Sequence, residues 1–299
     1  MSRADVEFAD VDGDGAADYL AANGSAQVWA WLGSRFASKR WDSQGTIAAG
    51  VPGGTLAALR FADLNGDRKT DYLQVDPQGR VSAWINNLPS SRWTEWGQVA
   101  AGVPGGTREE VRFADMDCDG RDDYLLVDPQ GRVRAWLNVL PTKTWTEWGQ
   151  VAAGVSGGTR ENLRFADVNG DGCDDYLMVG PQGQVRAWGN VLPNRTWTEL
   201  GEIAAGIGLH NSTITFADVD GDGRDDYLSV NDCGRIWAWR NTGSSTWPLQ
   251  GEITTGLRAP SRDQVFLGDI NGDRRLDYLL SDPAGVVTAW HGNGQIRKN

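Results

Sequence analysis

Residues 115–123 read DMDCDGRDD, and the chain continues at once as YLLVDPQGRVRAWLN. The stretch places carboxylates at positions 1, 3, 5 and 9 of a nine-residue loop, which lies between the short run VRF and a strand-like run. Calcium takes about six to eight oxygen ligands of this kind. The stretch therefore predicts a cation-binding loop between two strands.

The loop is repeated along the chain. Loops 1 to 6 begin at Asp10, Asp63, Asp115, Asp167, Asp218 and Asp269, at spacings of 53, 52, 52, 51 and 51 residues. Such a period indicates units that bury their apolar faces only against their neighbours. We therefore expect the 299 residues to form one domain, residues 1–299, rather than two. The units are placed at 4–56, 57–108, 109–160, 161–212, 213–262 and 263–299.

Each unit is predicted to contain four strands. Unit 3 reads VRFAD, the loop, DYLLV, the turn DPQG, RVRAWLN and then WTEWGQVAAG. These runs are β-branched and aromatic, and Gly, Pro, Asn and Asp separate them. Four antiparallel strands in about 50 residues are typical of a propeller blade. The prediction is an all-β, six-bladed propeller with the loop between strands 1 and 2 of each blade. Only HGNGQIRKN follows Trp290, so the last blade is either incomplete or completed by residues 294–296.

Up to six calcium ions are predicted, bound by side chains at positions 1, 3, 5 and 9 and by the carbonyl at position 7. The alternative is that these loops are metal-free turns held by side-chain-to-backbone hydrogen bonds. Loops 2, 3 and 6 have Arg68, Cys118 and Arg274 where other loops have glycine, and we expect them to bind more weakly. The predicted ligands are Asp10, Asp12, Asp14, Ala16 and Asp18; Asp63, Asn65, Asp67, Lys69 and Asp71; Asp115, Asp117, Asp119, Arg121 and Asp123; Asp167, Asn169, Asp171, Cys173 and Asp175; Asp218, Asp220, Asp222, Arg224 and Asp226; and Asp269, Asn271, Asp273, Arg275 and Asp277.

The charge balance excludes some partners. The formal charge is −12, and basic residues are scattered, so a nucleic-acid backbone would be repelled. No apolar run is long enough for a membrane span. We expect a secreted or extracellular protein whose export signal lies outside this sequence. The three cysteines fall at different repeat positions, which favours free thiols, with one bridge as the alternative.

The unit FAD(V/L/M)(D/N)GDGxxDYL resembles the FG-GAP or VCBS repeat. This repeat is known from integrin α-subunit propellers, from fungal lectins of the Psathyrella velutina type and from repeat domains attached to SGNH-type esterases. The resemblance implies a propeller with calcium between the first two strands of a blade, here at Asp10, Asp12, Asp14 and Asp18 and their equivalents. It leaves the ligand open, because those proteins bind different things.

Most of the fifteen tryptophans occupy two repeat positions. The first set ends strand 3, and we expect it to fill the wedge between blades. The second set opens strand 4, where either wedge packing or stacking on a sugar ring is expected. The first set is Trp31, Trp84, Trp136, Trp188, Trp239 and Trp290. The candidate ligand-binding residues are the second set, Trp41, Trp93, Trp145, Trp197 and Trp247, with Glu95, Glu147 and Glu199, and, on the opposite rim, Arg108 and Arg160.

Catalysis is not predicted. The chain has two histidines and none of the G-x-S-x-G, H-E-x-x-H or phosphate-loop motifs, and metal binding accounts for its paired carboxylates. Units 2, 3 and 4 keep WTE, and units 2 and 3 also keep AAGV and GGTR, which fits repeated small-ligand sites and fits a recent duplication equally well. The prediction is a calcium-stabilised, multivalent propeller that binds glycans or glycoproteins. The alternatives are a protein-interaction or structural propeller and a non-catalytic repeat domain of a larger secreted hydrolase.

Overall fold

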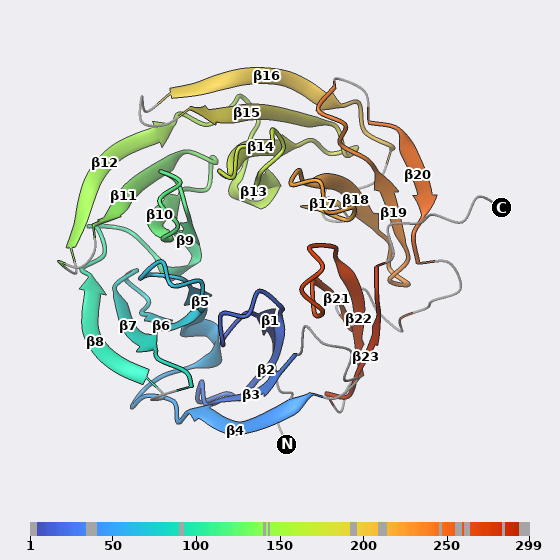
Figure 1. Ribbon diagram of the computed structural model, residues 1–299. Coiled ribbons are helices and arrows are strands. Elements are labelled where there is room, and N and C mark those ends of the chain that lie inside the picture. Colours follow the sequence, from blue (N-terminus) through green and yellow to red (C-terminus); the bar gives the residue numbers. More distant parts are fainter. Residues whose placement is uncertain are drawn as a thin grey trace.

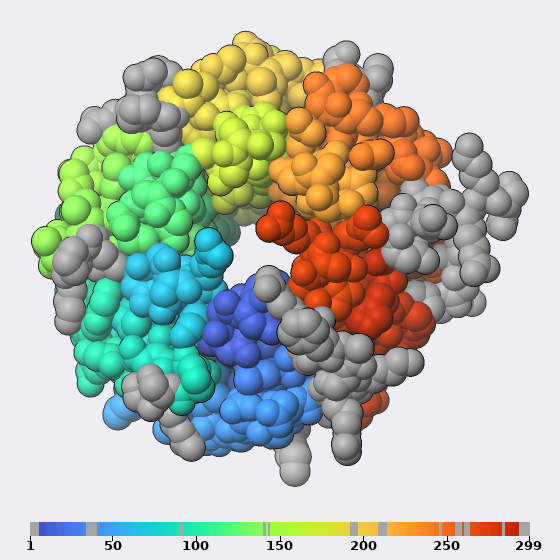
Figure 2. Space-filling view, viewed as in Figure 1, coloured from blue at the N-terminus to red at the C-terminus, as the bar shows by residue number. Residues whose placement is uncertain are grey.

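The protein is a ring of six β-sheets around a central opening (Figures 1 and 2). The computed structural model describes residues 5–33, 41–89, 93–139, 142, 144–191, 196–208, 214–244, 247–254, 259, 264–282 and 285–292. The strands of each sheet follow one another in sequence order and pair antiparallel, from the innermost strand outward. The predicted all-β, six-bladed propeller is thereby confirmed.

The strands have these bounds. Blade 1 has β1 (Asp5–Ala9), β2 (Asp18–Ala22), β3 (Val28–Leu32) and β4 (Asp42–Ala48); blade 2 has β5 (Leu59–Ala62), β6 (Asp71–Val75), β7 (Val81–Asn86) and β8 (Trp93–Ala100); blade 3 has β9 (Val111–Ala114), β10 (Asp123–Val127), β11 (Val133–Val139) and β12 (Thr144–Ala152). Blade 4 has β13 (Leu163–Ala166), β14 (Asp175–Val179), β15 (Val185–Val191) and β16 (Thr196–Ala204); blade 5 has β17 (Ile214–Ala217), β18 (Asp226–Val230), β19 (Ile236–Trp239) and β20 (Leu249–Glu252); blade 6 has β21 (Val265–Gly268), β22 (Asp277–Ser281) and β23 (Val287–Trp290).

Short 3₁₀ helices precede the innermost strands of blades 2, 3 and 4. They are η1 (Leu56–Ala58), η2 (Arg108–Glu110) and η3 (Arg160–Asn162). In η2, Thr107 and Glu110 form a reciprocal capping box, which satisfies backbone donors at both ends of the turn. The turns η2 and η3 bring the sequence GGTRE to the inner edge of the ring.

Each blade packs an aromatic face against the aliphatic face of the preceding blade. Phe113, Tyr124, Trp136 and Trp145 of blade 3 cover the core of blade 2, whose members include Leu73. The rings meet edge to face, with centroid separations of 5.5 Å between Tyr124 and Trp136 and 6.0 Å between Tyr124 and Trp145. Trp84, Trp136, Trp188 and Trp239 of the first tryptophan set therefore pack in the wedges, as expected, whereas Trp290 is 37% exposed.

A tyrosine hydrogen bond joins every pair of neighbouring blades. The Tyr124 hydroxyl donates to the carbonyl of Gly79 at 2.9 Å, and equivalent bonds are made by Tyr19, Tyr72, Tyr176, Tyr227 and Tyr278. The bond of Tyr19 reaches Gly285, so blade 1 is held against blade 6 by the contact used elsewhere. In blade 6 the described residues form three strands, and residues 294–296, the predicted fourth strand, lie outside the described residues.

Candidate metal centres and ligand surfaces

Each acidic loop connects the two innermost strands of its blade, and its last carboxylate is buried. In loop 3, Asp123 begins β10 and is 1% exposed. Its Oδ2 accepts a hydrogen bond from the Met116 amide at 3.0 Å, and its Oδ1 accepts one from the Asn138 amide at 2.7 Å. Equivalent aspartates make the same pair of bonds in every loop; they are Asp18, Asp71, Asp175, Asp226 and Asp277. These bonds fix the carboxylate under the loop.

Three of the predicted ligand positions converge in three loops. Carboxylate oxygens from positions 1, 3 and 9 lie within 4.8 Å of one another in loops 1, 3 and 5. The residues are Asp10, Asp12 and Asp18; Asp115, Asp117 and Asp123; and Asp218, Asp220 and Asp226. Three carboxylates this close repel one another, and a divalent cation is the chemistry that removes the repulsion.

Two oxygens in these clusters have unused acceptor capacity. The Oδ1 atoms of Asp117 and Asp220 are buried, and neither accepts a hydrogen bond from a described residue. Burial and the neighbouring Asp119 and Asp115 raise the pKa of Asp117. Burial raises the pKa of Asp123 to about 8. Because buried acceptors are normally paired, the donor set fits a calcium ion at these loops.

Position 5 is not part of the clusters found in the described structure. Its Oδ1 instead accepts the backbone N–H of position 7, as between Asp119 and Arg121 at 3.0 Å. Position 1 also has backbone partners, since the two oxygens of Asp115 accept the amides of Asp119 and Gly120. These bonds match the alternative of Asp-rich turns, but each carboxylate oxygen retains a lone pair. The role of position 5 and of the carbonyl at position 7 as ligands stays a prediction.

Loops 2, 4 and 6 have asparagine at position 3 in place of aspartate. Asn169 of loop 4 donates from Nδ2 to the Oδ1 of Asp175 at 3.2 Å, and Asn271 of loop 6 contacts the Nδ1 of His291 at 3.1 Å. In loop 4 the amide of Asn169 therefore offsets part of the negative charge of Asp175, as a cation would. These loops still present the predicted carboxylates at positions 1, 5 and 9.

The loops that depart from the glycine pattern keep the same backbone. Arg68, Cys118 and Arg274 have φ values of 67°, 62° and 66°, close to those of the glycines at the same positions in other loops. The left-handed region costs a non-glycine residue free energy. Their backbone therefore leaves the loop shape intact, and the weaker metal binding expected of them stays a prediction.

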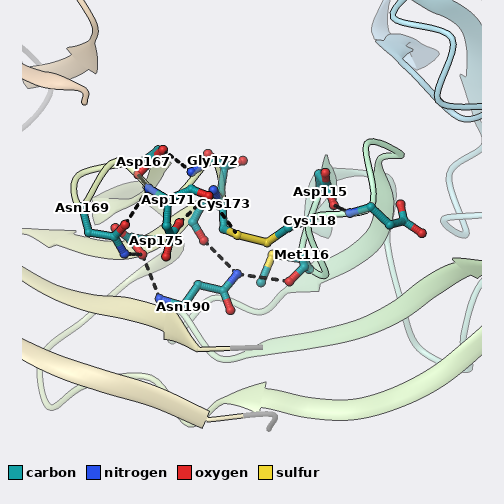
Figure 3. The surroundings of a disulfide bond; sticks show 12 residues. Asp115, Met116, Cys118, Asp167, Asn169, Asp171, Gly172, Cys173, Asp175 and Asn190 are labelled. Atoms are coloured by element: carbon teal, nitrogen blue, oxygen red, sulfur yellow. Dashed lines mark hydrogen bonds between the residues drawn. A yellow bond between two sulfur atoms is a disulfide. The ribbon is translucent and has the colours of Figure 1, made fainter. Parts of the chain in front are cut away.

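Cys118 and Cys173 form a disulfide, so the expectation of free thiols is wrong for this pair (Figure 3). The side chain at position 7 of each loop lies over position 4 of the preceding loop; a Cβ on Gly66 would be 3.1 Å from the Cγ of Arg121. In loops 3 and 4 these two positions are both cysteine, with Cα atoms 5.4 Å apart. Position 4 of one loop and position 7 of the next loop are thus neighbours in space, although they are different positions of the repeat. Cys233 is a free cysteine.

A buried asparagine that was not predicted ties each of several loops to its neighbour. Asn138 lies near the end of β11, and its Nδ2 donates to the carbonyl of Leu64 in loop 2 at 2.8 Å and to the carbonyl of Asp122 in its own loop at 3.0 Å. Asn86, Asn190 and Asn241 make the same bonds. The recurrent Asn after the strand-3 Trp, as in AWLN and AWGN, was the available sequence signal.

The second tryptophan set lies between blades, where it is half-buried. The Nε1 of Trp145 donates to the carbonyl of Val99 in the preceding blade at 2.6 Å, and Trp93 and Trp197 bond to Ile47 and Val151 in the same way. Trp41 packs on Phe8 and Tyr19, and Trp247 on the core of blade 4. Wedge packing accounts for these residues, and sugar stacking on their outer faces stays a prediction.

The predicted polar candidates occupy two different surfaces. Glu95, Glu147 and Glu199 are exposed on the outermost strands, where Glu147 pairs with Arg134 at 2.6 Å and Glu199 pairs with Arg186. The guanidinium of Arg134 also stacks on Trp136 at 5.0 Å, and that of Arg186 on Trp188 at 5.4 Å. Arg108 and Arg160 belong to η2 and η3 at the inner edge, where Arg108 donates to the carbonyl of Val75.

The FG-GAP-like repeat model matches residues 10–74, 63–126, 115–178, 167–229 and 218–280. The chain belongs to the FG-GAP-like repeat family. Each match extends from one acidic loop to the second strand of the next blade, so it contains the features described above. No curated protein matches the chain.

Solved structures with the same fold include lectins and a toxin. A structure of an Agrocybe aegerita lectin that recognises non-reducing terminal N-acetylglucosamine has a TM-score of 0.61 and 17% identity, over 99% of this chain and 82% of that one. The structure of the BP39L lectin from Burkholderia pseudomallei has a TM-score of 0.59 and 15% sequence identity, over 95% of this chain and 79% of that one. The structure of the Photorhabdus luminescens Tc holotoxin pore has a TM-score of 0.68 and 20% sequence identity, over 95% of this chain and 14% of that one. Similarity at these identities establishes the fold alone.

Proposed function

We propose that this FG-GAP-like propeller is a calcium-stabilised, multivalent carbohydrate-binding protein without catalytic activity. Its calcium would occupy the acidic loops at the inner end of each blade. Its ligands would be glycans or glycoproteins, bound at equivalent places on several blades. The repeated exposed surface of blades 2, 3 and 4 carries the proposal, and the lectins that share the fold support it.

The metal part of the proposal rests on donor chemistry. Three loops gather carboxylates within 4.8 Å, and two of them hold a buried oxygen to which no described residue donates. The formal charge of −12 equals the opposite of six divalent cations, so a fully loaded protein would be neutral. Hard oxygen donors of this kind select calcium over softer metals.

The carbohydrate part rests on repetition. Glu95, Glu147 and Glu199 are exposed at one position of β8, β12 and β16, each paired across the sheet with a first-set tryptophan. In blades 3 and 4 an arginine stacked on that tryptophan completes an aromatic and charged surface. Such surfaces bind a sugar by its apolar face and its hydroxyl groups, and several weak sites gain affinity together.

The proposed compartment follows from the disulfide. Disulfides persist in oxidising environments, so the Cys118–Cys173 bridge fits a secreted or extracellular protein. Among the described residues, the structure has no helix with the length and apolar character needed to cross a membrane. We further propose that residues 1–299 act as one propeller domain.

A glycan array of the calcium-loaded protein tests the function. Binding to a defined glycan should fall at least tenfold in the triple variant E95Q/E147Q/E199Q and after chelation. The matched control is Q98A/Q150A/E202A, which alters exposed residues of the same three strands and should bind normally. A blank array from folded, calcium-loaded protein would reject the proposal in favour of a protein-interaction propeller.

A further inference from the structure

A cavity between blades 3 and 4 concentrates positive charge in an acidic protein. The cavity has a volume of about 400 Å³, and its lining includes Arg112 of β9, Arg160 of η3, Arg164 of β13 and one carboxylate, Glu161. Val127 and Phe165 supply apolar wall. Three guanidinium groups therefore share one concave site with a single carboxylate.

We propose that this cavity binds an oxyanion group, a carboxylate or a sulfate, carried by a small ligand. The site goes beyond the proposed function, because it does not require the ligand to be a sugar. Guanidinium groups match such anions with paired, charge-assisted hydrogen bonds. The apolar wall would cover the uncharged part of the ligand.

Two of the guanidinium groups are held in position by the backbone. The Nη1 of Arg112 donates to the carbonyls of Glu109 and Val111 at 2.9 and 2.8 Å. The Nη1 of Arg164 donates in the same way to Glu161 and Leu163, both at 2.8 Å. One nitrogen thus fixes each group, while Nε and Nη2 remain for a ligand. Side chains ordered before binding lose less entropy when the ligand arrives.

The positive charge is not neutralised by ion pairs within the described residues. No described carboxylate forms an ion pair with Arg112 or Arg164, whereas Arg160 pairs with Glu161 at 3.6 Å. The Glu161 side chain is 68% exposed, and that of Arg160 only 20%. Burial lowers the pKa of Arg112, and the positive charges of Arg160 and Arg60 lower it further. An anion in the cavity would relieve this repulsion.

The equivalent cavity between blades 1 and 2 shows that the fold does not impose the charge. It measures about 320 Å³ and retains Arg60 in place of Arg164. Glu7 replaces Arg112 there, and Leu56 and Ala57 replace Arg160 and Glu161. One arginine and one glutamate balance in that cavity. The chain therefore offers a neutral control within the same architecture.

The test is calorimetric titration of the calcium-loaded protein with sodium sulfate, sodium glucuronate and, as the uncharged probe, glucose, at constant ionic strength. We expect sulfate or glucuronate to bind and glucose not to bind at this site. Arg160→Gln and Arg164→Gln should each weaken anion binding at least tenfold. Arg132→Gln, which changes an exposed arginine of blade 3 outside the cavity lining, should change it less than twofold. Binding of sulfate but not of glucuronate would identify a sulfate site. Binding of glucuronate but not of sulfate would identify a carboxylate site.

Gain of function gives a second readout if the loss variants unfold. The double variant E7R/L56R gives the cavity between blades 1 and 2 the three arginines of the other cavity, and it should add one anion site to the measured stoichiometry. Titrations no different from sodium chloride, or equal weakening by Arg132→Gln and Arg164→Gln, would overturn the proposal. Because the titration uses simple anions, its result is independent of the glycan array.

Discussion

Loops 3 and 4 lie side by side with the same backbone path, yet only loop 3 gathers three carboxylates (Figure 3). In loop 3, Asp117 has a buried oxygen without a described donor, and burial raises the pKa of Asp123 to about 8. In loop 4, Asn169 donates to Asp175, whose pKa burial raises to about 6. One carboxylate-to-amide change thus separates a loop whose carboxylates need a cation from a loop whose own amide satisfies part of that need.

The same difference alternates round the ring. Loops 1, 3 and 5 have aspartate at position 3 and are called aspartate loops below, whereas loops 2, 4 and 6 have asparagine and are called asparagine loops. Six similar loops therefore need not be six similar metal sites. Affinity for a divalent cation rises with the number of charged ligands, so the aspartate loops should bind first.

Calcium removal should produce the largest effect. Each occupied site adds about 2.7 kcal/mol to the free energy of unfolding when calcium is at 100 times its Kd, and the chelator removes this at every site. We expect a large fall in Tm by calorimetry. Titration of the metal-free protein should resolve three tight sites, one for each aspartate loop. An unchanged Tm in excess chelator would refute metal binding, and six equal sites would refute the distinction between loops.

Exchanging the residue at position 3 should convert one loop type into the other. Asp117→Asn should reduce the tight sites from three to two, and Asn169→Asp should raise them to four. We expect a change in affinity at the altered loop of about tenfold, or about 1.4 kcal/mol. Both substitutions are nearly isosteric, and Gln130→Ala in an exposed turn of blade 3 is the control. Unchanged stoichiometry in both variants would mean that position 3 does not decide binding.

The pH dependence of the metal-free protein should also distinguish the two loops. The folded pKa of Asp123, about 8, lies above its ordinary value of 3.8, so the folded state binds this proton more tightly than the unfolded chain. Stability from this group is therefore present in acid and is lost as pH rises from about 4 to about 8. Asp123→Asn should flatten the curve of Tm against pH across that window, and Asp175→Asn only below about pH 6. Identical curves for the two variants would contradict the difference between the loops.

The repeated features were predictable because they recur at equal positions of the units. The period, the loop pattern and the aromatic runs led to six four-stranded blades, and the strand-3 Trp136 was correctly placed in a wedge. The loop pattern also agrees with the convergence of positions 1, 3 and 9 in loops 1, 3 and 5. A single sequence displays both the period and the pattern within each unit directly.

The features that were missed depend on how neighbouring units are offset. The Cys118–Cys173 bridge joins position 4 of one loop to position 7 of the next, and no comparison of equal repeat positions reveals that pair. Asn138 reaches the preceding loop for the same reason. The positive cavity combines Arg112 of one blade with Arg164 of the next. Sequence periodicity defines a unit, whereas the rotation between units decides which unlike positions meet.

The bridge between loops 3 and 4 also has a consequence for proteolysis. It encloses the chain from Cys118 to Cys173, which includes the outer strands β11 and β12 and the turn at η3. A protease that cuts once inside this segment leaves two fragments still covalently joined. The nicked protein would run as two bands only after reduction, and its blades would stay in register while the cut ends separate. The molecule can therefore survive a single cut in those connections of blade 3 that lie between the two cysteines.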